Sequence, residues 1–78
     1  MDIKIAIGRK IRSLRSLTCF MQEELADRAG IDRTYITSLE RGKRNISVVD
    51  VEKIAVALKV DISELFKFED IVNTSADR

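Results

Sequence analysis

The sequence predicts an all-α fold, and three of its features support that prediction. Its 78 residues include no proline and only three glycines, at positions 8, 30 and 42. Apolar residues make up 45% of the chain and aromatic residues only 5%, so aliphatic side chains must form the core. These apolar residues recur at helical spacing in five segments. We therefore expect five short helices in one domain over residues 1–78, with a core over about 3–68.

The first two helices follow from apolar spacing. Ile3, Ile7, Ile11 and Leu14 are four, four and three residues apart, which predicts a helix from Ile3 to about Ser16. A second helix is expected over about Gln22 to Ala29, where it would bury Leu25, Ala26 and Ala29. Gly30 follows at the place where a left-handed residue commonly ends a helix.

The third helix is predicted by its capping pattern. Asp32 is a suitable N-cap residue, and its carboxylate is expected to accept the backbone N–H of residue 34 or 35. Ile31 before the cap and Ile36 at the fourth helical position fit a hydrophobic staple. Gly42 is expected to end this helix.

Two further capping patterns predict the remaining helices. Ser47 and Asp50 resemble a capping box for a helix over about residues 48–59. Its apolar stripe would be Val48 or Val49, with Val51, Ile54, Ala55 and Leu58. Asp61 and Glu64 repeat the pattern for a fifth helix that would carry Ile62, Leu65, Phe66 and Phe68. The tail at residues 73–78 has nothing to bury and is expected to fray.

Composition excludes several classes of function. The chain has one cysteine, Cys19, and no histidine, so neither a disulfide, a metal cluster nor the usual general base is expected. We expect no enzyme, cofactor or small-molecule ligand. No apolar run approaches the ~20 residues of a membrane span, and the first residues lack a signal-peptide pattern. The chain is therefore expected in the cytoplasm.

The net charge of +1 conceals an uneven distribution of charge. Residues 1–45 contain ten Lys or Arg and six Asp or Glu, a net +4, whereas residues 46–78 contain four and seven, a net −3. A basic first part suggests one surface that faces a polyanion, although scattered surface charge would give a similar count.

The second and third helices, joined by a tight glycine turn, have helix-turn-helix geometry. On a helical wheel Ile36 and Leu39 point inward, and Arg33 lies on the flank at the exposed N-terminal end. The outward positions are Thr34, Thr37, Ser38 and Arg41. A recognition helix contacts base edges with its N-terminal residues, so this pattern favours DNA binding over an ordinary solvated face.

A resemblance to a known family rests on the segment MQEELADRAGIDRTYITSLERGKRNISVVDVEKIAVALKVDISELF. It looks like the five-helix DNA-binding domain of phage lambda repressor and Cro relatives, over about residues 6–66. Within it, DRTYITSLERGKRN most resembles the small controller proteins of restriction–modification systems. The resemblance implies a homodimer that binds a palindromic operator on double-stranded DNA and controls transcription, with RNA polymerase as a further candidate partner.

The resemblance also assigns individual residues. It gives base reading to Arg33, Thr34, Thr37 or Ser38, and Arg44. It gives contacts with the DNA backbone to Gln22, Tyr35, Arg41, Lys43 and Asn45. For Tyr35 a half-buried place at the edge of the core is equally expected. It further implies a partly buried ion pair between Arg15 and Glu40 that joins the first helix to the third.

Two positions depart from the family pattern. Cys19 stands where the family usually has glycine after the first helix, and Met21 stands where Ser or Thr usually caps the second. Met21 cannot accept the N–H bonds of a cap, a loss of roughly 1 kcal/mol. For Cys19 we expect a buried or half-buried small apolar side chain rather than a reactive thiol.

The acidic second part is expected to form the dimer interface. Phe66 and Phe68, with Ile71 and Val72, leave more apolar surface than a fifth helix can bury in its own domain. The interface residues we predict are Ile46, Val49, Leu65, Phe66 and Phe68. The alternatives left open are a monomer, a phage-type repressor, the antitoxin of a toxin–antitoxin pair, and a protein-interaction module that does not bind DNA.

Overall fold

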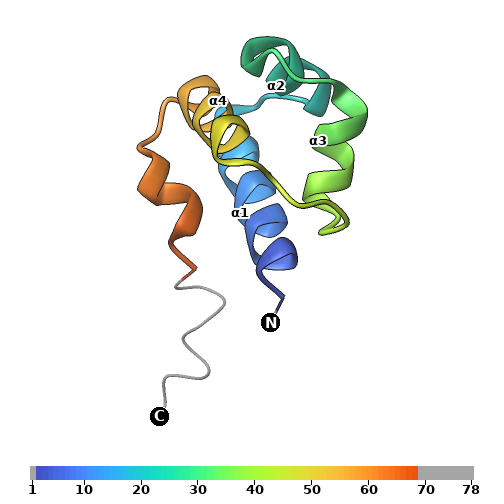
Figure 1. The fold of residues 1–78 in the computed structure, drawn as a ribbon. Helices are drawn as coiled ribbons and strands as arrows, with labels where there is room; N and C mark the ends of the chain where they lie inside the picture. Colours follow the sequence, from blue (N-terminus) through green and yellow to red (C-terminus); the bar gives the residue numbers. More distant parts are fainter. Residues whose placement is uncertain (1, 69–78) are drawn as a thin grey trace.

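The computed structural model describes residues 2–68, which form four α-helices and one short 3-10 helix (Figure 1). The α-helices are α1 (Ile3–Thr18), α2 (Gln22–Ala29), α3 (Arg33–Glu40) and α4 (Val48–Leu58). The 3-10 helix η1 covers Ile62–Phe66. Residues 2–68 contain no strand, so the predicted all-α class is confirmed for this part of the chain.

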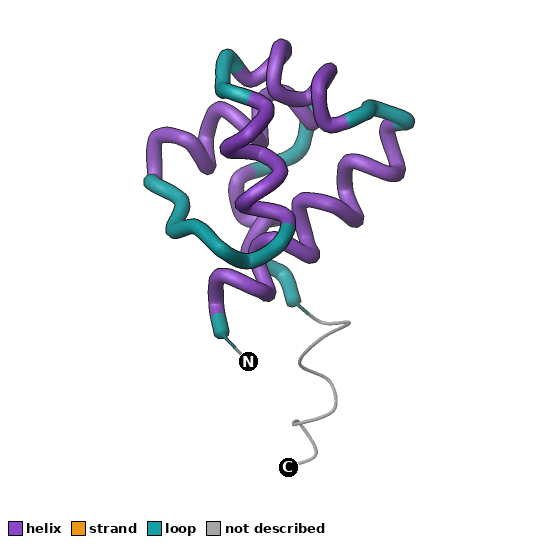
Figure 2. The backbone as a smooth tube through the Cα atoms, turned by 90° about the vertical axis from the view of Figure 1, so that its right-hand side faces the viewer, coloured by secondary structure: helices purple, strands orange, loops and turns teal. Residues whose placement is uncertain are grey.

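The helices pack around α1. In Figure 1, α3 lies on one side of α1 and η1 on the other, while α2 closes the top of the molecule. The tube in Figure 2 shows that the connections between α1, α2 and α3 are short, whereas a longer loop joins α3 to α4. Each element places at least one fully buried side chain in the core, and these are Ile11, Leu25, Ile36, Leu39, Ile54 and Leu65.

The predicted N-cap residues lie at the starts of their helices, but one predicted capping hydrogen bond is absent. Ser47 accepts the backbone N–H of Asp50 at 3.1 Å, and Asp61 accepts that of Ser63 at 3.2 Å. Asp32 does occupy the N-cap of α3, but its side chain makes no capping hydrogen bond, so the predicted bond to residue 34 or 35 was wrong. Met21 caps α2 without a side-chain bond, as expected.

The turn after α1 uses a left-handed residue that is not glycine. Cys19 has φ 65°, a conformation that carries a steric cost for any residue with a Cβ. Its side chain is exposed, so the expectation of a buried cysteine was wrong.

The fifth predicted helix is the largest departure from the expected fold. Residues Ile62–Phe66 form a 3-10 helix instead of an α-helix, and it ends after five residues where Lys67 adopts an extended conformation (φ −92°, ψ 105°). Ile71, Val72 and the tail at 73–78 lie outside the described residues.

The apolar stripes of α1 and α4 begin later than expected. Ile3 is 57% exposed and Val48 82% exposed, whereas Ala6 and Val51, three residues further along, are 5% and 4% exposed. None of the helices in the described part is long and apolar enough to cross a membrane.

One glycine, to which the sequence analysis gave no role, fixes how closely α1 and α3 approach. Gly8 is buried in α1, and a Cβ built there would collide with the carbonyl oxygen of Leu39. The carbonyl oxygen of Glu40 would be only 3.0 Å from the same atom. The C-terminal end of α3 therefore rests directly on the α1 backbone.

Candidate nucleic-acid interface

The outer face of α3 is available to a partner. Arg33 and Thr34 at the start of the helix are exposed, whereas Ile36 and Leu39 on the opposite face are 0% and 1% exposed. Thr37 and Ser38 are half-buried one turn later, and Arg41 is exposed just after the helix. The structure therefore places the predicted base-reading residues of α3 along one side of the helix, with the most exposed of them at its N-terminus.

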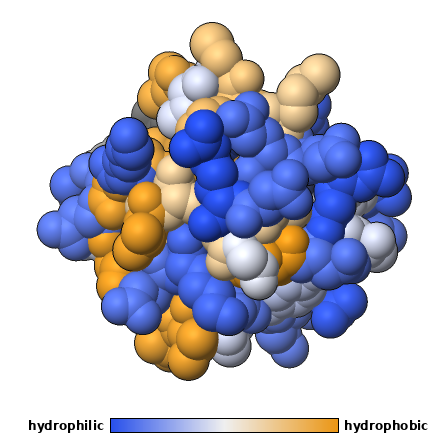
Figure 3. Space-filling model, turned by 90° about the horizontal axis from the view of Figure 1, so that it is seen from above, coloured by the Kyte–Doolittle hydropathy of each residue, from blue (hydrophilic) through white to orange (hydrophobic). Residues whose placement is uncertain are grey.

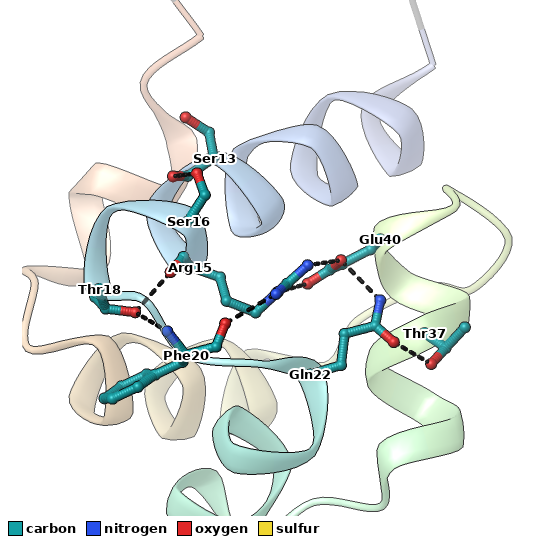
Figure 4. Close-up of polar contacts among 8 residues, drawn as sticks. All are labelled: Ser13, Arg15, Ser16, Thr18, Phe20, Gln22, Thr37 and Glu40. Carbon is teal, nitrogen blue, oxygen red and sulfur yellow. Dashed lines mark hydrogen bonds and ion pairs between the residues drawn. The ribbon is translucent and has the colours of Figure 1, made fainter.

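The predicted ion pair between Arg15 and Glu40 is present beneath α3 (Figure 4). Nε of Arg15 donates to Oε2 of Glu40 at 2.7 Å, and Nη2 donates to Oε1 at 3.0 Å. The two side chains are 15% and 3% exposed. Two parallel bonds between a planar guanidinium and a carboxylate fix both position and angle, so this pair sets the orientation of α3 on α1.

The same buried cluster includes Gln22, which the sequence assigned to a DNA phosphate. Nε2 of Gln22 donates to Oε1 of Glu40 at 3.0 Å, and Oε1 of Gln22 accepts the hydroxyl of Thr37 at 2.8 Å. Both ends of the amide are thus bonded to α3, through the carbonyl oxygen and one of the two N–H groups. In this structure Gln22 joins α2 to α3, a role that the sequence analysis did not predict.

The turn between α1 and α2 completes this cluster. Nη1 of Arg15 donates to the carbonyl oxygen of Phe20 at 2.9 Å. The hydroxyl of Thr18 donates to the carbonyl oxygen of Arg15 at 2.6 Å and accepts the N–H of Phe20 at 3.2 Å. We call Arg15, Gln22, Thr37 and Glu40 the polar network. Within residues 2–68, no buried side-chain nitrogen or oxygen lacks a hydrogen-bond partner.

The loop after α3 presents the second group of predicted DNA contacts. Gly42 turns the chain with φ 74°, and a Cβ there would be 2.8 Å from the Ile5 side chain, so the turn requires glycine. The exposed residues after it are Lys43, Arg44 and Asn45. In the described part of the chain no salt bridge is formed by Arg33, Arg41, Lys43 or Arg44. Four cationic groups are thus left for an anionic partner.

Tyr35 supports this loop from the side of α3. The guanidinium carbon of Arg44 lies 4.9 Å from the centre of the Tyr35 ring, and the Tyr35 hydroxyl donates to the carbonyl oxygen of Asn45 at 3.2 Å. Burial, followed by the nearby Asp50 carboxylate, raises the pKa of the Tyr35 phenol above its ordinary value. The hydroxyl therefore stays protonated near neutral pH. Tyr35 is half-buried, which agrees with the expected place at the edge of the core.

An apolar groove lies beside the loop. It has a volume of about 380 Å³, and its walls are formed by Ile3, Lys4, Ile7, Arg44, Asn45, Ile46, Val48, Val51 and Phe66. Phe66 is 48% exposed and Val49 60% exposed, whereas Ile46 and Phe68 are partly buried against the core. Leu65 is 0% exposed because it faces the core, so its predicted contact with a second subunit was wrong. Elsewhere the surface seen from above is largely hydrophilic with separate apolar patches (Figure 3).

Gly8 and Gln22 have structural roles that the sequence indicated to different degrees. Gly8 lies within the predicted first helix, and an isolated glycine in a helix often marks close packing. Gln22 gave no such signal, because its spacing on α2 is compatible with either an inward or an outward side chain. Within residues 2–68 no group of three or more Cys, Asp or Glu side chains is placed to hold a metal ion.

Comparisons with known proteins agree with this geometry. Residues 21–65, more than half of the chain, match the protein-family model described as Helix-turn-helix. The control protein C.MunI from Mycoplasma sp is 48% identical over 66 residues, which cover 83% of this chain and 89% of that protein. The control protein C.BamHI from Bacillus amyloliquefaciens is 41% identical over 73 residues, 92% of this chain and 90% of that protein.

A solved structure gives the same result for the fold. The restriction-modification controller protein C.AhdI from Aeromonas hydrophila superposes with a TM-score of 0.80 at 41% sequence identity. The match covers 81% of this chain and 96% of that one.

Proposed function

The chain belongs to the helix-turn-helix family of DNA-binding transcriptional regulators, and we propose that it is the controller protein of a restriction–modification system. In this proposal the helix-turn-helix consists of α2 and α3, residues 1–78 act as one domain in the cytoplasm, and the activity is binding without a catalytic step. The observation that supports it best is the set of exposed cations on α3 and in the loop after it, together with the partly buried ion pair that holds α3 on α1.

We assign two kinds of contact to this surface. Arg33, Thr34, Thr37 or Ser38, and Arg44 read bases in the major groove, where arginine can donate two bonds to guanine. Tyr35, Arg41, Lys43 and Asn45 contact phosphates and set the register without reading sequence. Gln22 also belongs to this second group, because only one of the two N–H groups of its amide is bonded to Glu40 and the other can donate to a phosphate.

We further propose that two copies bind a palindromic operator. Two-fold symmetry would place two α3 helices about one DNA turn, ~34 Å, apart. Phe66 and Val49 are exposed apolar side chains, and the groove beside them offers a surface that a second copy would cover. Ile46 and Phe68 would support this interface from the edge of the core. RNA polymerase is a further candidate partner at the promoter.

The test of DNA reading is a selection followed by a salt titration. Full-length protein would select duplexes from a random library, and the enriched palindrome would be compared with random duplex of equal length. We expect specific binding whose log affinity falls with log salt at about 0.9 per phosphate contacted. Equal affinity for both duplexes at every salt concentration would rule out a sequence-specific regulator and favour an interaction module.

The test of the dimer is the substitution Phe66→Glu. A carboxylate there would be buried without a partner in a dimer but solvated in a monomer, so the equilibrium should move toward monomer. Sedimentation should show a lighter species with an unchanged helical spectrum. A wild type that sediments as a monomer at tens of micromolar would contradict the interface and leave the DNA contacts standing.

A further inference from the structure

Thr37 has its hydroxyl group turned away from the surface that it shares with Thr34. The hydroxyl donates to Oε1 of Gln22 at 2.8 Å, and Figure 4 shows it directed from α3 toward α2. A threonine hydroxyl has a single proton to donate. The donor of Thr37 is therefore already used within the protein.

The chemistry of Glu40 fixes the direction of this bond. Glu40 as a carboxylate only accepts hydrogen bonds, so the amide end of Gln22 that faces it at 3.0 Å must be the NH₂ group. The carbonyl end of Gln22 is then the end that faces Thr37, and it can only accept. Arg15 donates two further bonds to the same carboxylate, so the bonds from Arg15 and from Thr37 through Gln22 converge on Glu40.

The group that Thr37 leaves for a partner is its methyl. Threonine in a helix populates two χ1 rotamers because its hydroxyl can bond to the preceding turn. Here the bond to Gln22 selects one of them, with the oxygen toward α2. Thr37 is half-buried and lies one turn after the exposed Thr34 on the same side of α3. With its hydroxyl bonded to Gln22, the methyl is the part of the side chain that remains for contact with a base.

We propose that Thr37 reads a thymine through contact between its methyl group and the C5-methyl of the base, with Gln22 as the residue that positions it. This rests on the proposed DNA-binding function and specifies what one residue of that surface recognises. In the major groove the C5-methyl is the apolar feature that distinguishes thymine from the other bases. Removing one buried methyl contact should weaken binding about fourfold, and roughly 15-fold when both half-sites of a palindrome lose it.

The experiment is a scan of the selected operator in which each thymine is replaced in turn by deoxyuridine, which lacks only the methyl group. Wild-type protein should lose affinity at one pair of symmetry-related thymines, which are then the bases that Thr37 contacts. The loss should be about fourfold when one thymine of the pair is replaced and roughly 15-fold when both are. Thr37→Ser keeps the hydroxyl and its bond to Gln22 but lacks the methyl. It should bind the thymine operator about as weakly as wild type binds the deoxyuridine operator, and the deoxyuridine change should cost it nothing further.

Two matched variants complete the design. Thr37→Val keeps a methyl without the hydroxyl and should remain sensitive to deoxyuridine at the same positions, whereas Thr34→Ser should leave that sensitivity unchanged. If no operator position responds to deoxyuridine, or if Thr37→Ser retains the wild-type response, the methyl reading is overturned while sequence-specific binding stands. If the selection enriches no sequence at all, the proposed function fails and this inference fails with it.

Discussion

Two neighbouring parts of the proposed DNA-binding surface are held by different kinds of contact. The polar network holds α3 through charged hydrogen bonds, whereas the loop after α3 is held by contacts with Tyr35. Arg15 and Glu40 form two bonds in a partly buried setting, with 15% and 3% of their side chains exposed. Arg44 is exposed and rests on one face of Tyr35 at 4.9 Å. A buried charge pair is costly to disrupt, whereas an exposed cation–π contact is weak. The comparison suggests that α3 is presented rigidly and the loop is free to adapt to DNA.

The largest effect is expected from breaking the network. Glu40→Ala would strand the Arg15 guanidinium in a partly buried site and should lower the free energy of unfolding by up to about 3 kcal/mol. Urea melts without DNA would measure it. The matched control is Glu24→Ala, which removes the exposed pair with Arg28 (3.0 Å, side chains 46% and 49% exposed) and should change stability by under ~1 kcal/mol. If both substitutions lower the free energy of unfolding by the same small amount, the Arg15–Glu40 pair contributes no more to stability than the exposed Glu24–Arg28 pair.

A smaller effect is expected from the loop contact. A double-mutant cycle of Tyr35→Leu and Arg44→Ala should give a coupling of about 0.5–1 kcal/mol in unfolding free energy, the value typical of exposed cation–π pairs. Tyr35→Phe keeps the ring and should retain this coupling while it loses the bond to Asn45. A coupling as large as that expected for the network would contradict the adaptable loop.

The smallest expected effect is a dependence of stability on pH that comes from Tyr35, the residue that supports the loop. Burial and the Asp50 carboxylate raise the pKa of Tyr35, so the folded state keeps its proton to higher pH than the unfolded chain. Stability from this group is present below the unfolded value of about 10 and is lost as pH rises through the folded pKa. Tyr35 is the only tyrosine and the chain has no tryptophan, so phenolate absorbance reports it alone. Asp50→Asn should move its titration toward the ordinary value, and an unmoved titration would remove Asp50 as a cause.

Much of this arrangement could be predicted from the sequence, because local signals determined it. Capping residues and apolar spacing located α2, α3 and α4 to within a residue or two, and family resemblance indicated the Arg15–Glu40 pair. The remaining features depend on tertiary packing. The inward bond of Thr37 exists only because Gln22 on α2 faces it, and the need for Gly8 exists only because the end of α3 rests on α1. The assigned DNA contacts stay predictions.

The same distinction explains why the fifth helix is shorter than predicted and of the 3-10 type. Asp61 does cap the segment, as its pattern indicated, but a cap determines where a helix begins and not how long it is. The extended Lys67 ends η1 directly after Phe66, and Leu65 packs into the core. No feature of the sequence distinguished the buried Leu65 from its exposed neighbour Phe66, because both are apolar and adjacent.

The most direct test of the account compares Arg33→Ala with Lys43→Ala on selected and random duplexes at one salt concentration. Both residues are exposed cations, but Arg33 begins the rigid α3 and Lys43 belongs to the loop. We predict that Arg33→Ala costs roughly 1–3 kcal/mol on the selected duplex, with relaxed preference at one symmetric base position and little change on random DNA. Lys43→Ala should weaken binding to both duplexes alike. If Arg33→Ala weakens binding to both duplexes equally, α3 does not read sequence and the account is contradicted.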